Sequence, residues 1–284
     1  MKDRSPITMA LNRLLPLILI ALAIPTWLPA QTPGPDSATD PQSDQPIAST
    51  RALRNMAQQL FEMGNQARAA QGLPALQWDT ALAAAALKHC ARMAAEGPIS
   101  HQYNGELDLS RRAGQAGAHF NLIEENVAVG PTPAAIHQSW MNSPGHRDNL
   151  LNPEVNRAGV AVVPGGNLLY AVVDFSRAVS ALTGDQVEST VVALLQAKGI
   201  AAHGRSAGAR QACAQESGMP AALDGRRPEF IMRWQDSSLD RLPDALLARI
   251  ASGRYHDAVV ASCTEESADK TFTVYRMAVL LLRP

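Results

Sequence analysis

The pattern Gly-x-Ser-x-Gly occurs at residues 204–208 and places Ser206 where α/β-hydrolases carry their nucleophile. Asp224 or Asp240, followed by His256, would complete the chain order of such a triad. That motif requires a sharp turn between a buried strand and a helix in a large parallel sheet. The flanking residues are small and polar on both sides, and only about one hundred residues are available for a sheet. The sequence therefore favours a loop at Ser206 over a catalytic elbow.

Three cysteines and the absence of a CxxC pair exclude a zinc ribbon and a thioredoxin-like redox centre. Cys213 and Cys263 are the natural candidates for a disulfide in an exported chain. A bridge over about fifty residues contributes about 4 kcal/mol in the chain-entropy model. Cys90 is left over in the apolar row of an expected helix, where a buried thiol is unreactive.

The composition is that of a globular protein close to neutral charge. Among its 284 residues, 25 Lys and Arg oppose 26 Asp and Glu, and 46% are apolar. Without an excess of basic residues, a surface for nucleic acid is not expected.

The N-terminal residues 1–30 have the features of a signal peptide. Three basic side chains precede the apolar run Leu14–Ile24, and Ala30 offers a small residue for cleavage. A run of eleven residues is too short for a membrane-spanning helix, which needs about twenty. We therefore expect a secreted protein, extracellular or periplasmic, with no integral membrane segment after cleavage. Residues 31–50 contain four prolines and few apolar side chains, which predicts a disordered, Pro-rich linker.

Residues 51–180 are predicted to form an α+β domain. Apolar spacing of three and four residues predicts a helix from about Thr50 that ends at Gly72. Further helices are expected from Asp79, an N-cap, to Glu96, and after Thr132 as the cap with Pro133 in the first turn. The runs 158–163 and 168–175 predict a hairpin of antiparallel strands.

Residues 181–284 are predicted to form a second, smaller α/β domain of unknown role. Asp185 and Glu188 suggest a capping box at the start of a helix that Gly199 ends. A strand, a helix and two further strands are expected after it, at residues 230–234, 243–251, 256–263 and 271–282.

Several motifs between Asn65 and Phe175 resemble one known family. They are, in order, NQARAAQGLPALQWDTALAAAALKHCARMA, an isolated histidine, IEENVAVG, SWMNSPGHRDNLL, and GVAVV followed by LLYAVVDF. These pieces resemble the CAP superfamily, also called SCP-like, of cysteine-rich secretory, antigen and pathogenesis-related proteins. The resemblance covers roughly residues 55–177, and WMNSPGHR is similar to the bacterial branch. It implies an α-β-α sandwich whose loops form a cleft.

Members of this family keep two histidines and two glutamates in the cleft. The resemblance assigns His101 and His146 as the histidines and Glu125 as the first glutamate. The second glutamate follows Trp140 in many eukaryotic members but has no counterpart here, where residues 141–143 are Met, Asn and Ser.

Two imidazoles and a carboxylate can bind a divalent metal such as zinc and leave one position open. The same side chains could instead act in general acid/base catalysis, with Glu125 or a neutral imidazole accepting a proton from water. We place Asn126 beside them as a ligand-binding position, where its amide also holds the loop backbone. Residues 143–145 are expected to form a turn that ends a helix and directs His146.

The leading hypothesis is a secreted, non-catalytic CAP-domain protein that binds a ligand or divalent metal around His101, Glu125 and His146. The partner would be a small molecule, a lipid or an envelope component, because the family resemblance does not select one. One alternative is a metal-assisted hydrolase of cell-wall or peptide material. Another is an adhesion or interaction module with a vestigial cleft.

Overall fold

The structure is a computed structural model that describes residues 45–284, except 216, 224, 264–270 and 283–284. The expected signal peptide, most of the expected linker and Asp224 lie outside the described residues. The first helix, α1 (Gln45–Ala70), begins five residues earlier than expected, inside the predicted linker. Pro46 does not prevent this, because proline is tolerated in the first turn of a helix.

A mixed sheet of four strands occupies the first part of the described chain. Its order is β1-β3-β4-β2, and only β1 and β3 are parallel. The strands are β1 (Gln77–Trp78), β2 (Phe120–Gly130), β3 (Arg157–Gly165) and β4 (Leu168–Ala178). The hairpin of β3 and β4 is confirmed, whereas β2 was not predicted as a strand.

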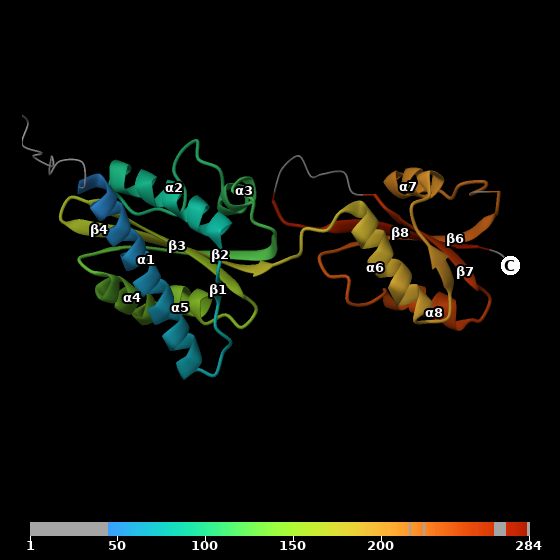
Figure 1. Cartoon of the computed structure of the whole chain (residues 1–284), viewed down its shortest axis with the longest axis horizontal. Helices are drawn as coiled ribbons and strands as arrows, with labels where there is room; N and C mark the ends of the chain where they lie inside the picture. The colour runs from blue at the N-terminus through green and yellow to red at the C-terminus, as the bar shows by residue number, and fades with distance from the viewer. Residues whose placement is uncertain (1–44, 216, 224, 264–270, 283–284) are drawn as a thin grey trace, which may run out of the picture. The chain divides into compact units, whose positions relative to one another are not determined.

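Helices cover both faces of this sheet (Figure 1), which confirms the expected α-β-α sandwich. One face packs against α1, α4 (Pro133–Asn142) and α5 (Pro144–Leu150). The other face packs against α2 (Thr80–Glu96) and α3 (Leu109–Gln115).

The start of α2 lies very close to β3. Asp79 caps the helix, because its Oδ1 accepts hydrogen bonds from the amides of Ala81 and Leu82 at 2.8 and 3.0 Å. Directly below, Gly159 of β3 leaves no room for a side chain: an added Cβ would lie 2.0 Å from the nitrogen of Ala83. A glycine here therefore sets the distance between helix and sheet.

A second mixed sheet follows, in the order β5-β7-β8-β6. Its strands are β5 (Ala201–His203), β6 (Pro228–Asp236), β7 (Asp257–Ser262) and β8 (Tyr275–Leu282). Helices α6 (Gly184–Gln196) and α8 (Asp244–Ala251) pack on one face, and α7 (Ala207–Ala214) packs on the other. A second, smaller α/β region is therefore present, and the division of the chain near residue 180 stays a prediction.

The capping box of α6 differs from the prediction. It is formed by Thr183 and Gln186, two residues before the expected pair. Glu188 is instead buried, and its carboxylate accepts hydrogen bonds from the backbone of Arg205 at 2.7 Å and of Ser262 at 2.9 Å. A side chain used for these tertiary contacts is not available to cap its own helix.

Ser206 and the cysteines have structural roles. The Ser206 hydroxyl accepts a hydrogen bond from the amide of Ala209 and caps α7. A disulfide joins Cys213 to Cys263, the pair favoured by the sequence. Cys90 is free and fully buried, and burial raises the pKa of its thiol to about 12, so the reactive thiolate is disfavoured.

None of the described helices is both long enough and apolar enough to cross a membrane.

Gly159→Ala is expected to destabilise the fold by about 1–3 kcal/mol, because the added methyl group would force α2 away from β3. Urea unfolding measures the free energy of unfolding. Gly145→Ala is the matched control, since an added Cβ there meets no atom within 4 Å. Equal stability of the two variants would contradict the close approach.

Candidate functional site

Glu125 lies on β2 and is the buried centre of a polar cluster. It is only 6% exposed and faces α2, like Val127 two residues later. Its neighbour on β4 is Asp174, so two carboxyl groups lie side by side on the same face of the sheet. A buried charge of this kind requires partners.

Arg112 of α3 supplies the opposite charge. Its Nη2 donates a hydrogen bond to Oε2 of Glu125, and both side chains are buried. Its Nη1 donates to the backbone oxygens of His101 at 3.1 Å and Leu107 at 3.2 Å. Arg112 therefore fixes both the Glu125 carboxylate and the segment that carries His101. Sequence reasoning missed it, because nothing local distinguishes it from Arg111.

His101 reaches Glu125 from the segment between α2 and α3. Its Nδ1 lies 2.9 Å from Oε1 of Glu125, while 60% of the side chain is exposed. The hydrogen bond to Glu125 is the main cause that raises the pKa of His101 above its usual 6.5. With Nδ1 donating to the carboxylate, Nε2 is the nitrogen that keeps a lone pair in the neutral ring.

His146 lies on α5, because the expected turn at residues 143–145 is instead the start of this helix. Burial, followed by the nearby charge of His101, lowers the pKa of His146 below 6.5. Its Nδ1 is buried and has no hydrogen-bond partner among the described residues. His146 is thus a neutral imidazole at ordinary pH, and its Nδ1 is unpartnered among the described residues.

Asn126 attaches α5 to β2. It is fully buried, and its Nδ2 donates to the backbone oxygen of His146 at 2.7 Å. Its Oδ1 accepts from Asn149 at 3.0 Å. The side chain predicted to bind a ligand therefore uses both its polar atoms inside the protein and positions His146.

His89 and Glu106 extend the polar cluster under α2. His89 is fully buried, with Nδ1 2.8 Å from Oε1 of Glu106 and Nε2 2.8 Å from the backbone oxygen of Ser100. Its Nε2 also lies 3.9 Å from Glu125. The sequence predicted only packing for His89, but its two hydrogen bonds hold the segment that leads to His101.

The metal assignment of His101, Glu125 and His146 stays a prediction. Within the described parts of the chain, no group of three or more His, Cys, Asp and Glu side chains is arranged to hold a metal ion. Both oxygens of Glu125 already accept from protein donors. Direct coordination by Glu125 would therefore require His101 or Arg112 to move.

Asp174 is the second residue that sequence reasoning missed. It is completely buried, and neither carboxyl oxygen has a hydrogen-bond partner among the described residues. Burial, then the charge of Glu125, raises the pKa of Asp174 well above 3.8 and favours the protonated acid. A single carboxyl group in the apolar run of β4, on the same face as Val172, was the available signal.

The folded protein should lose stability from Asp174 as pH rises above 3.8, because the unfolded chain releases this proton more easily. Each pH unit over which the buried acid stays protonated costs about 1.4 kcal/mol. Asp174→Asn removes that cost, so its free energy of unfolding should rise relative to wild type as the pH increases above 3.8. Urea unfolding across this range measures the difference. A difference that is constant with pH would refute this.

Imidazole titration by NMR should give a pKa above 6.5 for His101 and below 6.5 for His146. Glu125→Gln should lower the pKa of His101, since a neutral amide favours the charged ring less than the carboxylate does. The raised pKa also means that this pair stabilises the fold at low pH, and that the contribution disappears as pH rises through the pKa of His101. An unchanged His101 titration in the variant would disprove the pairing.

Comparison with known proteins places these residues in a family. The model of the cysteine-rich secretory protein family, CAP, matches residues 61–175. Uncharacterized protein YkwD of Bacillus subtilis is 30% identical over 135 residues, which are 46% of this chain and 51% of that protein. Uncharacterized membrane protein YlbC of the same organism is 33% identical over 106 residues, 37% of this chain and 30% of that protein. The chain thus spans about half of the first relative's length and less of the second's.

Two bacterial solved structures are similar to part of the chain. An extracellular SCP-domain protein from Bacillus anthracis is 31% identical with a TM-score of 0.44, covering 46% of this chain and 43% of that chain. A cysteine-rich secretory protein from Staphylococcus aureus is 25% identical with a TM-score of 0.37, covering 44% and 39%. The family match agrees with the motifs in the sequence and with the α-β-α sandwich of the described residues. Residues 61–175 of this chain are therefore a CAP domain, the part that the family model matches.

Proposed function

We propose that this CAP-domain protein is exported and acts by binding a ligand at His101 and His146, without catalysing a reaction. This proposal rests mainly on the 2.9 Å contact between Nδ1 of His101 and Oε1 of Glu125. The contact fixes the imidazole ring and leaves its Nε2 for a ligand. The unpartnered Nδ1 of His146 supplies a second nitrogen from another element. Two imidazoles from separate segments are well suited to a divalent cation such as zinc.

Glu125 has an orienting role in this proposal. Histidines that bind metals commonly donate their other ring nitrogen to a carboxylate, which fixes the tautomer and the ring. Glu125 makes this contact with His101, while Arg112 holds its second oxygen. A carboxylate engaged on both oxygens is a poor general base, and this argues for binding rather than hydrolysis.

Export is supported by the disulfide and by the N-terminal sequence. A Cys213–Cys263 bridge persists in oxidising compartments and is rare in the cytosol. The basic start and the apolar run Leu14–Ile24 are those of a secretory signal. Two of the similar proteins are described as extracellular or secretory.

Zinc should raise the melting temperature of the metal-free, full-length protein. At one hundred times the dissociation constant, a bound ion contributes about 2.7 kcal/mol, or roughly 5 °C for a protein of this size. His101→Ala and His146→Ala should each reduce this shift, because each removes one ligand nitrogen. Differential scanning fluorimetry, with metal analysis of dialysed protein, measures the effect.

His203→Ala is the matched control, because His203 is exposed on β5 in the second sheet. It should keep the full zinc shift. The metal proposal fails if wild type shows no shift and no bound metal, or if all three variants respond equally.

A further inference from the structure

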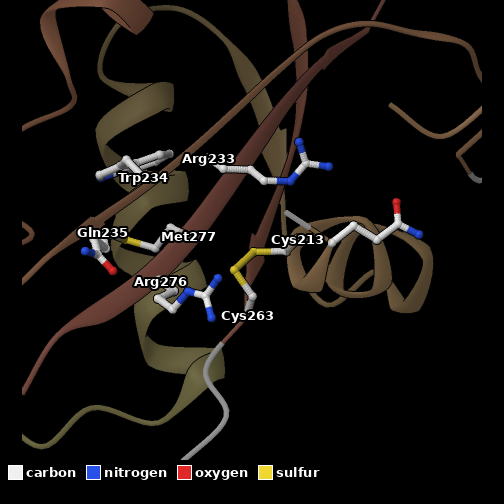
Figure 2. A pocket seen from close by; sticks show the side chains of 8 residues that line it. Cys213, Arg233, Trp234, Gln235, Cys263, Arg276 and Met277 are labelled. Atoms are coloured by element: carbon white, nitrogen blue, oxygen red, sulfur yellow. A yellow bond between two sulfur atoms is a disulfide. The ribbon is translucent and has the colours of Figure 1, made fainter. Parts of the chain in front are cut away.

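A small cavity of about 260 Å³ lies beside the disulfide of the second sheet (Figure 2). Its polar lining consists of two arginines and two glutamines, next to the Cys213–Cys263 bridge. These four side chains are Arg233 and Gln235 of β6, Arg276 of β8, and Gln215, which follows α7. None of the described residues that line the cavity is a carboxylate.

The strand register explains why the two arginines share one face. Gln235 lies directly opposite Arg276, and Arg233 lies opposite Ala278, two residues further along β8. Arg233 and Arg276 are therefore diagonal neighbours on the face that packs against α7, where Ala278 is buried. Figure 2 shows both arginine side chains and the disulfide around the cavity.

Arg233 is held in place by the protein. Its Nε and Nη2 donate to the backbone oxygen of Ala212 at 3.0 and 2.7 Å, and Nη2 also donates to Gly218 at 2.7 Å. The contact with Ala212 lies near the end of α7, where carbonyls lack partners inside the helix. This capping role fixes the guanidinium and leaves Nη1 without a hydrogen bond among the described residues.

Arg276 has a different environment. It is exposed, and its guanidinium makes no hydrogen bond or ion pair within the described parts of the chain. Two like charges at diagonal cross-strand positions repel each other. An anion between them would relieve this repulsion and supply acceptors for the unused N–H groups.

We propose that this cavity binds a small oxyanion, either a carboxylate or a phosphate group. The guanidinium groups supply paired donors that match the oxygens of both groups, and the glutamine amides can add further donors. Arg233 is the preorganised part of the site, and Arg276 is the part that closes on the ligand. The site is separate from His101 and His146.

Calorimetric titration of the full-length protein with malonate and with phosphate, at constant ionic strength in chloride, tests this. One saturable site is expected. Arg276→Gln should weaken binding about tenfold or more, because it removes one charged donor group. Arg276→Glu should abolish binding. The probe that binds more tightly identifies the carboxylate or the phosphate as the preferred ligand.

Arg241→Gln makes the same charge change at an exposed residue outside the cavity, so it should bind like wild type. His101→Ala should also bind like wild type, which separates this site from the proposed zinc site. The proposal is overturned if neither probe saturates up to about 10 mM. The proposal is also overturned if the Arg276→Gln and Arg241→Gln variants bind malonate or phosphate with the same affinity.

Discussion

The buried ion pair of Arg112 and Glu125 is the interaction on which the candidate site depends. Both side chains are withdrawn from water, so neither charge is tolerable without the other, and loss of one partner from such a pair typically costs about 3–5 kcal/mol. The same guanidinium also binds the backbone at His101 and Leu107. Arg112 of α3 therefore holds two parts of the site together. It pairs with the Glu125 carboxylate on β2, and it fixes the backbone of the segment that carries His101.

The packing of α2 on the sheet gives that pair its environment. Because Gly159 lets the helix backbone lie directly on β3, little space remains between the two layers. His89 and Asp174 are completely buried in this layer. Their polar atoms must be satisfied by the protein or by protonation, since little water can reach them. The close contact between Gly159 and α2 thus helps to keep water away from the carboxyl group of Asp174.

The sequence was sufficient where structure is decided locally. The Asp79 and Thr132 caps and the β3–β4 hairpin depend on a few adjacent residues, and all three are present. β2 was missed because Glu124, Glu125 and Asn126 interrupt its apolar pattern, and a strand with a polar site in the middle looks like a loop. Arg112 could not be found, because its partner lies thirteen residues away on another element and only the fold brings them together.

The disulfide makes the stability of the second sheet depend on the cell compartment. The bridge closes a span of fifty residues from α7 to the end of β7, and its reduction would remove a constraint worth about 4 kcal/mol. The CAP domain contains only Cys90 and has no such bond to lose. In a reducing compartment the second sheet would therefore lose this constraint, and its segments would open to proteases more readily than with the bridge intact.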